Sequence, residues 1–461
     1  MLSAQIDVWT LQFRSCFSRQ ASFRWFVLAL WGMFLRVEGQ GLTSVIRCLG
    51  LGDPDYRGLL HFFHSKAFSA QKLCVAWRSI VLKSAPLLRL QGKPLFVVDG
   101  IKVGKSGRKM PGVKLLHQES EDNSKPEYLM GHYWGALSVL ATTAGLAVAI
   151  PLRFQLQDGV KRSPSEKATL VDKMATLVTD LLDGCVGYVI GDRYFASKKM
   201  FVPLLSKGLH FIGACRRNTV AYLPPPPRKP GTRGRPRKRG DKVTLATLFK
   251  NKSLFVTSEI HLYGKTQKIQ HHALDLWWLG VFVRFVLSVN PEGRRGIFVS
   301  TDISLTAEEI LRAYGFRFKI EDGFKSFVHT MFGMGYRFWM KAMIRTKRGM
   351  GNIYLHRSGD KTRTGVLRKL EAYERFVNLA AIAMGMLQLL GLTMKEAAGA
   401  GGLYFRTPPK LTMPSVLGVR CALQGEIRAI FDKNESKPLL AKLLGEMKRA
   451  VTAPHPMKVA A

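Results

Sequence analysis

The spacing of apolar residues changes from a helical to a strand-like pattern near residue 90. Before that point, apolar positions recur at helical spacing through residues 26–35 and 73–82. Between them, residues 43–50 and 53–63 resemble two short helices around a glycine-containing turn. This pattern is compatible with a helix-turn-helix unit that binds DNA and, equally, with a small helical bundle that packs on a core. We therefore expect residues 1–90 to form a helical region, which binds DNA on the first interpretation.

From residue 94 onward, apolar runs bounded by turn residues predict strands. Five such runs follow one another, at residues 95–99, 132–141, 146–154, 188–191 and 209–213. Helices are predicted after the third run and near residues 197–207. The first of these helices is expected to start at Ser163, Pro164 and Glu166, which supply an N-cap, a first-turn proline and a capping-box acid. Three meandering strands followed by helix, strand, helix and strand is the order of an RNase H-like fold, although other α/β layouts share it.

Residues 216–296 interrupt that order. A run of four prolines leads into a basic segment and then into three more predicted strands, at residues 252–260, 267–274 and 281–287. Residues 297–302 are predicted to return to the core as a strand, and Thr306 with Glu309 forms a capping box for the helix that carries Glu321. Residues 371–392 are predicted to be an apolar helix behind the core.

The predicted fold class is therefore α/β, with an RNase H-like core (a mixed sheet flanked by helices) interrupted by a β-rich insert. Helical N-terminal and C-terminal regions complete the chain. The predicted boundaries are 1–90 for the N-terminal region, 91–215 and 297–395 for the two parts of the core, 216–296 for the insert with its basic loop, and 396–461 for a C-terminal region that can support dimerisation.

The net charge of the chain indicates which kind of molecule it binds. The 461 residues include 70 Lys and Arg against 32 Asp and Glu, a formal charge of +38. Such an excess repels itself in a compact protein unless a polyanion neutralises it, and nucleic acid is the usual polyanion. The alternatives are a ribosome-associated protein or a protein of the membrane surface. We expect double-stranded DNA to be the partner.

The cysteines and the most membrane-like segment indicate the compartment. Six cysteines are scattered without a C-x-x-C pair, which argues against a zinc site or a disulfide scaffold and for a reducing compartment. Residues 25–35 form an apolar run of only eleven residues, whereas a spanning helix needs about 20. We therefore expect a cytoplasmic, nucleoid-associated protein that makes no membrane contact.

The acidic residues with the clearest chemical pattern lie far apart in the sequence. Asp99 and Asp192 each close an apolar strand, and Glu321 lies on a predicted late helix. On that helix Tyr314, Arg317, Glu321 and Lys325 are spaced by three, four and four residues and share one face. Such a face can grip phosphate beside a metal-ligating acid, and two strand-end acids with a helical one form the layout of a two-metal phosphodiester site. For Glu321 alone, the alternative is an exposed intrahelical ion pair.

These residues resemble a known family. Asp99, Asp192 and Glu321, with the spacing Tyr-x2-Arg-x3-Glu, are similar to the DDE transposases of bacterial insertion sequences, above all the insertion-sequence-four type. That type carries a β-rich insert between its second Asp and its Glu, and the 129 positions from Asp192 to Glu321 leave room for one. The resemblance covers roughly residues 90 to 390. The family's lysine, seven residues after the Glu, is replaced here by Val328, and Lys325 is the nearby candidate.

The resemblance implies a DNA transposase that binds transposon ends, cleaves phosphodiester bonds and transfers strands. It implies two Mg²⁺ ions held by Asp99, Asp192 and Glu321, with Mn²⁺ able to substitute, and a homodimer assembled on DNA. Two other functions remain open. One is an RNase H-like DNA nuclease without strand transfer, and the other is a non-catalytic DNA-binding descendant of a transposase.

Further DNA contacts are expected from cationic and aromatic residues. Tyr314, Arg317, Lys325 and Arg193 would hold the phosphate at the DNA end. The basic loop contributes Arg233, Arg235, Arg237, Lys238 and Arg239, and its Arg-Gly-Arg-Pro sequence matches the core of a minor-groove hook. The alternative is a solvated loop that contacts phosphates without regard to sequence. In relatives an aromatic of the insert stacks on a flipped base, which Trp277 or Trp278 could do; buried packing is the alternative.

Overall fold

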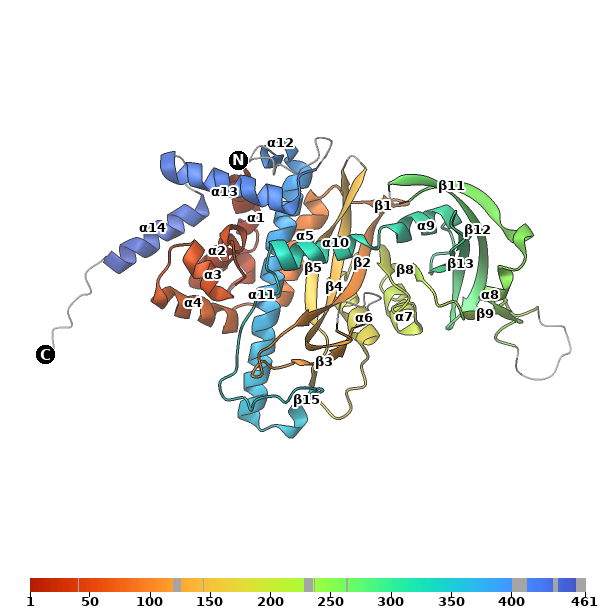
Figure 1. Cartoon of the computed structure of the whole chain (residues 1–461), viewed down its shortest axis with the longest axis horizontal. Coiled ribbons are helices and arrows are strands. Elements are labelled where there is room, and N and C mark those ends of the chain that lie inside the picture. Colours follow the sequence, from red (N-terminus) through yellow and green to blue (C-terminus); the bar gives the residue numbers. More distant parts are fainter. Residues whose placement is uncertain are drawn as a thin grey trace.

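The fold is organised around one large mixed β-sheet with helices packed on it (Figure 1). The computed structural model describes residues 1–39, 41–118, 126–143, 145–227, 235, 237–262, 264–399, 413–433 and 438–452. Along the sheet the strands follow the order β10-β9-β12-β13-β14-β8-β7-β2-β4-β3, with β5 paired to β4 and β11 to β12. The predicted α/β class with a mixed sheet and flanking helices is confirmed.

Five strands form the core of this sheet, namely β2 (Lys93–Gly104), β4 (Tyr128–Thr143), β5 (Leu146–Leu156), β7 (Gly187–Gly191) and β8 (Leu209–Ala214). Their spatial order is β5-β4-β2-β7-β8. The first three are antiparallel neighbours, whereas β2, β7 and β8 are parallel. A meander followed by two parallel strands on its first strand's free edge is the RNase H-like arrangement. Helices α6 (Leu170–Leu181) and α7 (Lys198–Leu205) make the crossovers that parallel strands require.

The start of α6 differs from the prediction. Its N-cap is Thr169, whose hydroxyl accepts from the Asp172 amide at 3.3 Å, while Asp172 caps the Thr169 amide in return. Glu166, predicted as the capping acid, instead accepts from the Arg162 amide at 2.7 Å and pairs with Lys173 at 3.1 Å. Both segments offer a hydroxyl followed three residues later by an acid, so only the tertiary packing distinguishes them.

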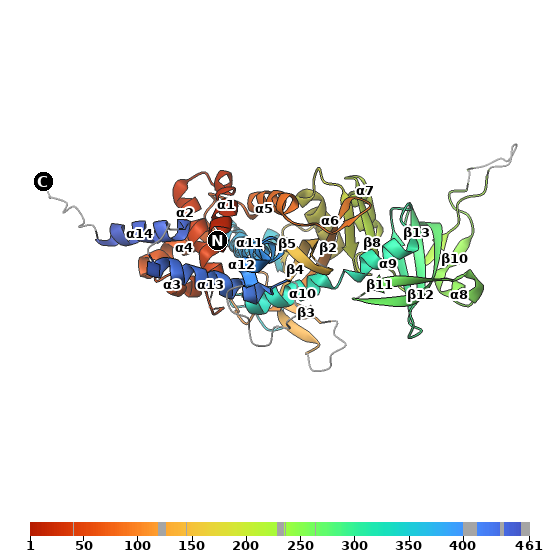
Figure 2. The ribbon, with the colours of Figure 1, turned by 90° about the horizontal axis from the view of Figure 1, so that it is seen from above.

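The strands of residues 216–296 extend the same sheet. Strand β14 (Arg295–Ser300) pairs with β8, and β13 (Val281–Val289), β12 (Lys265–Trp278) and β11 (Val256–Leu262) follow in order. The outer edge holds β9 (Val220–Tyr222) and β10 (Lys242–Thr244), with α8 (Leu245–Leu248) and the 3-10 turn η2 (Lys252–Leu254) next in the chain. These strands form the far end of the molecule from the N-terminal helices (Figure 2).

Helices from both ends of the chain gather on the other side. The N-terminal set is α1 (Leu2–Leu11), η1 (Arg14–Cys16), α2 (Gln20–Leu35), α3 (Leu42–Cys48), α4 (Asp53–His64) and α5 (Ala70–Ser84). The C-terminal set is α12 (Lys395–Gly399), α13 (Val416–Lys433) and α14 (Leu439–Thr452). The two sets are joined by hydrogen bonds, for example from the Ser3 amide to Glu426 at 2.9 Å and from the Leu439 amide to Asp7 at 2.8 Å.

Helix α11 (Asp360–Thr393) connects the helical side to the sheet. Within the described residues it is the one helix long and apolar enough to cross a membrane, but 94% of its most apolar window is buried inside the protein. It packs along β5 and against α2, α4, α5 and α13. Its first turns are charged and exposed, whereas residues 376–392 are buried all round, as expected for the part of a helix that lies in a core. The remaining short elements are β1 (Arg89–Leu90), β3 (Lys114–His117), β6 (Val160–Lys161), β15 (Ile353–Tyr354) and the turn η4 (Leu355–Arg357).

Candidate active site

Two parallel core strands place the first two acids side by side. Asp99 lies on β2, and Asp192 directly follows β7. In the register of this pair Val97 lies opposite Ile190, so Asp99 and Asp192, each two residues further on, point from the same end and face of the sheet. Both strands are buried on both faces up to these residues because they are apolar runs between packed layers. Strand β2 continues past Asp99 to Gly104 beside β4, so the expectation that Asp99 closes its strand was wrong; only the pairing of β2 with β7 ends just before the two neighbouring carboxylates.

The third acid reaches this place through Arg317. The Arg317 guanidinium donates from Nη1 to Asp99 Oδ2 at 3.2 Å and from Nη2 to Glu321 Oε1 at 2.5 Å. Asp99 and Arg317 are separated by 218 residues in the sequence. Arg317 thus holds Asp99 on the strand and Glu321 on the helix together. Its charge also lowers the pKa of Asp192, against the effect of burial.

The single helix predicted to run from the Thr306 capping box to Glu321 is divided into two helices in the structure. The capping box of Thr306 and Glu309 opens α9 (Ala307–Gly315), and Glu321 lies on the next helix, α10 (Lys319–Lys325). Between them the Arg317 amide bonds the Tyr314 carbonyl at 2.9 Å, an i→i+3 turn tighter than an α-helix. Gly315 and the aromatic residues beside it have low helix propensity, which favours a break here. The expectation of one helix sharing a single face was therefore wrong, although Arg317 and Glu321 still pair.

Burial and like charge make the Asp99 carboxylate electrostatically costly. Burial raises the pKa of Asp99 to about 6, with further contributions from the charges of Asp192 and Glu321. The Gly100 amide, 2.7 Å from Asp99 Oδ1, and the Arg317 guanidinium oppose this rise. Burial also raises the pKa of Asp192, against the Tyr194 amide at 3.0 Å and the charge of Arg317. A second cation placed among these oxygens would be strongly favoured.

The donor set fits a hard divalent cation in its chemistry. Mg²⁺ takes oxygen ligands, and three carboxylates supply them without histidine or cysteine. As the described side chains stand, no group of three His, Cys, Asp or Glu residues is arranged to hold a metal ion. The reason is visible in the ion pairs, because Arg317 occupies the space between Asp99 and Glu321. An ion bound by both acids would have to replace these contacts.

Of the other residues of the predicted phosphate-binding face, Tyr314 and Arg193 lie beside this centre. The centroids of the Tyr314 and Phe298 rings lie 4.9 Å apart. Against the effect of burial, the charges of Asp99 and Glu321, and then that of the Tyr314 phenol, raise the pKa of Arg317. Lys325 is exposed at the end of α10 and makes no ion pair with any described residue. Val328 follows in the π-helical turn η3 (Ser326–Thr330) and packs on the core. Arg193 is exposed next to Asp192, whose pKa its charge lowers.

The basic loop lies away from the three acids. Its described cations, Arg235, Arg237, Lys238 and Arg239, are exposed between β9 and β10, which lie at one edge of the sheet, whereas Asp99 and Asp192 lie at the interior strands β2 and β7. Arg239 stacks over the Tyr222 ring at 4.9 Å. Arg233 lies outside the described residues. The structure therefore does not bring these four described cations to the centre formed by Asp99, Asp192 and Glu321.

Trp277 and Trp278 are half-buried at the end of β12. The Trp277 ring lies 5.5 Å from Phe282, and the Trp278 ring lies 5.6 Å from Phe201 and 5.4 Å from Phe285. Both rings thus contact aromatic neighbours on β13 and α7, and neither contacts the residues around Arg317.

Two residues beside the acids were not anticipated from the sequence. A Cβ atom at Gly100 would lie 2.0 Å from the Tyr133 hydroxyl, so the Tyr133 phenol crosses directly over the strand next to Asp99. Burial raises the pKa of Tyr133, and the charges of Asp99 and Asp192 raise it further. The sequence signal is the glycine inside an apolar strand, which marks a close approach. The glycine indicates where a close approach occurs but not that Tyr133 is the residue that approaches.

Comparisons with known proteins add a family match. The model of the DDE superfamily endonuclease family matches residues 12–261, a span that includes Asp99 and Asp192. A comparison with curated proteins finds no match. Among solved structures, the chain is similar to piggyBac transposase in a synaptic complex with hairpin DNA, with 11% identity and a TM-score of 0.36 over 96% of this chain and 78% of that one. This structural likeness is too distant to assign a role to any residue.

Proposed function

Because the chain belongs to the DDE superfamily endonuclease family, we propose that it is a DNA transposase similar to the insertion-sequence-four type. In this proposal it binds transposon ends and catalyses metal-dependent strand cleavage and strand transfer. The observation that carries the proposal is the meeting of Asp99, Asp192 and Glu321 around Arg317. Three carboxylates at this point, in a chain with a net charge of +38, suit a polyanionic substrate that reacts at phosphorus.

Asp99, Asp192 and Glu321 would hold two Mg²⁺ ions, for which Mn²⁺ could substitute. Such ions supply an activated oxygen nucleophile and stabilise the leaving oxygen during in-line attack on phosphorus. The raised pKa of Asp99 supports this assignment, since a carboxylate that is costly to ionise alone gains most from a bound cation. In this proposal these three acids alone bind the metal ions.

Arg317 has two roles in this proposal. Without substrate it neutralises Asp99 and Glu321, and with substrate its guanidinium turns to a phosphate, to which it can donate two parallel hydrogen bonds. Tyr314, Lys325 and Arg193 would complete the phosphate grip around it. The pairing with Arg317 keeps the buried Asp99 carboxylate neutralised before DNA arrives, which limits the cost of an unpaired buried charge.

DNA binding outside the centre is assigned to the basic loop, with Arg233 among its cations. Pairing of two subunits on DNA and a location at the nucleoid in the cytoplasm belong to the same proposal. Since α13 and α14 pack on the chain's own N-terminal helices, an intersubunit contact would use their outer faces.

The test compares two neighbouring carboxylates on α10. Glu321 and Asp322 are equally exposed, at 50% and 51%, and each pairs with a cation. With DNA carrying the sequences that flank the gene, Glu321→Gln should abolish Mg²⁺-dependent cleavage and leave DNA binding near normal. Asp322→Asn should leave both near normal. Cleavage by Glu321→Gln at the wild-type rate would remove Glu321 from the site, and cleavage without joining to target DNA would favour a nuclease that lacks strand transfer.

A further inference from the structure

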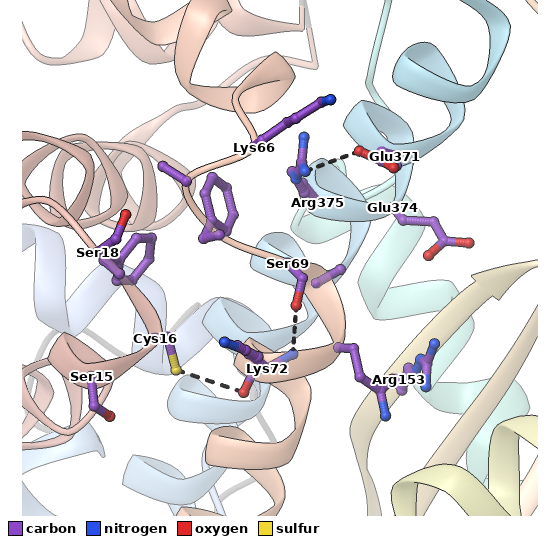
Figure 3. Close-up of a pocket in the computed structure, with 15 residues that line it drawn as sticks. Ser15, Cys16, Ser18, Lys66, Ser69, Lys72, Arg153, Glu371, Glu374 and Arg375 are labelled. Atoms are coloured by element: carbon purple, nitrogen blue, oxygen red, sulfur yellow. Dashed lines mark hydrogen bonds and ion pairs between the residues drawn. The ribbon is translucent and has the colours of Figure 1, made fainter. Parts of the chain in front are cut away.

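A polar cavity lies between the N-terminal helices and the core, away from the three acids. Its volume is about 560 Å³, and η1, the start of α5, β5 and α11 surround it (Figure 3). None of Asp99, Asp192 and Glu321 lines it. A cavity of this size lies within the range of sites for small ligands. Its lining contains charged side chains, which favours a polar ligand over an apolar one.

Two buried arginines in this lining have donors without acceptors. Arg153, on β5, is only 7% exposed, and its Nε and Nη1 have no hydrogen-bond partner within the part of the chain that the structure describes. Arg375, on α11, is 4% exposed; it donates to the Phe63 carbonyl at 2.9 Å and to Glu371 at 3.1 Å, but its Nε has no partner among the described residues. Buried donors left unpaired cost roughly 1–3 kcal/mol each. Both side chains thus indicate a missing acceptor.

The start of α5 adds a second feature that favours an anion. Ser69 caps this 15-residue helix by accepting from the Lys72 amide at 3.1 Å, and Ala70 and Gln71 line the cavity with the first turn. The amides of a first helical turn have no acceptor within the helix and carry its partial positive charge. Figure 3 shows Ser69 and Lys72 on one side of the space and Arg153 on another.

The charge balance of the lining is positive. Its cations are Lys66, Lys72, Arg153 and Arg375, and its acids are Glu371 and Glu374. Glu371 is paired with Arg375, and burial raises the pKa of Glu374, which weakens its ability to neutralise Arg153. Arg153 is therefore the cation whose charge and hydrogen bonds are least satisfied.

We propose that this cavity binds a phosphate group, held by Arg153, Arg375 and Lys72 at the start of α5. Phosphate fits better than a carboxylate because it offers several acceptor oxygens to two guanidinium groups and a helix terminus at once. The group can belong to a free phosphate-bearing molecule or to a DNA backbone that passes over the opening. In either case it joins η1 and α5 to β5 and α11, and so couples the N-terminal helices to the core.

Cys16 provides a reporter inside the cavity. It lines the space, is partly exposed, and its thiol donates to the Lys72 carbonyl at 3.6 Å. Cys421 is exposed on α13 and serves as the reference within the same molecule. The experiment measures iodoacetamide alkylation of both cysteines in the full-length protein by mass spectrometry. We expect saturating inorganic phosphate, compared with chloride at equal ionic strength, to slow Cys16 at least tenfold relative to Cys421.

Variants test whether this protection belongs to the site. Lys72 and Lys83 are both exposed on α5, but only Lys72 lines the cavity. Lys72→Gln should raise the phosphate concentration for half-protection at least threefold, whereas Lys83→Gln should not change it. Arg153→Met should abolish protection. Should Arg153→Met not fold, the pair on α5 and the wild-type protein still decide the matter.

A second arm distinguishes the two sources of phosphate. Protection by inorganic phosphate indicates a free phosphate-bearing ligand. Protection by a short DNA duplex alone, lost in Lys72→Gln, indicates a backbone phosphate. No protection by either, or equal protection in Lys72→Gln and Lys83→Gln, would overturn the proposal. The result is independent of metal-dependent cleavage, which Glu321→Gln reports separately.

Discussion

Asp99→Asn should make the protein more stable and inactive at the same time. Asn has the size of Asp and removes the buried charge, but its one amide oxygen can accept from only one of the Gly100 amide and Arg317, which bond different oxygens of Asp99. The pKa of about 6, against a usual value of 3.8, means that the folded state disfavours the charged form. Two pKa units correspond to about 3 kcal/mol at neutral pH. Part of this is lost because the Asn amide NH2 cannot accept the hydrogen bond that the second Asp99 oxygen accepts, so we expect a gain of about 2 kcal/mol.

The pH dependence of this gain has a definite sign. Because the folded pKa of Asp99 is raised, its contribution to the free energy of unfolding falls as pH rises from about 4 to about 6 and is constant above that. The Asp99→Asn variant lacks this titration. Its advantage over wild type should therefore be largest at pH 7.5 and small at pH 4, and at pH 7.5 it should raise the midpoint of thermal unfolding by about 2–4 °C.

The assay is thermal unfolding of both proteins at a series of pH values, with and without Mg²⁺. Mg²⁺ should stabilise the wild type and narrow the gap, since a ligand that binds only the folded state raises its stability. Asp322→Asn, which removes an exposed acid, serves as the matched control and should show neither effect. An Asp99→Asn variant that is no more stable than wild type at pH 7.5, or a gain that does not change with pH, would refute the electrostatic reasoning.

Three further predictions concern the strand next to Asp99, the helix α10 and the basic loop. Gly100→Ala should displace the Tyr133 phenol and impair cleavage, whereas Gly104→Ala on the same strand, with no atom of the described residues within 4 Å of its Cβ position, should be tolerated; equal activity of the two would contradict the close approach. Lys325→Ala should slow cleavage of a pre-cut DNA end at least tenfold at equal occupancy, and Lys319→Ala, on the same helix, should not. Replacing the exposed cations of the basic loop by Gln should flatten the salt dependence of log K for DNA by roughly 0.9 per lost phosphate contact; an unchanged slope would show that the loop does not bind. The replaced residues are Arg235, Arg237, Lys238 and Arg239.

Features that depend on neighbours in the sequence were accessible from the sequence alone. The strands that carry Asp99 and lead to Asp192 follow from short apolar runs, although β2 continues past Asp99 to Gly104. The Arg317–Glu321 pair follows from a separation of four residues. The order of the five core strands along the chain follows from the alternation of apolar runs and helical segments, whereas their spatial order β5-β4-β2-β7-β8 does not. The residues at which helices start or break were harder to predict from the sequence. Thr169 caps α6 instead of Ser163, and α9 ends before Arg317, because several nearby residues offer similar local bonds and packing selects among them.

Contacts between distant residues were decided by the tertiary structure. The Arg317–Asp99 pair spans 218 residues, and no local pattern indicates that this guanidinium occupies the space between two of the acids. The approach of Tyr133 to Gly100 depends on the register of β4 against β2. Likewise Arg153 and Arg375 look like ordinary cations in the sequence, yet both are buried at one cavity. Local bonding energies depend on a few adjacent residues, whereas burial and charge pairing depend on which surfaces the packed sheet and helices bring together.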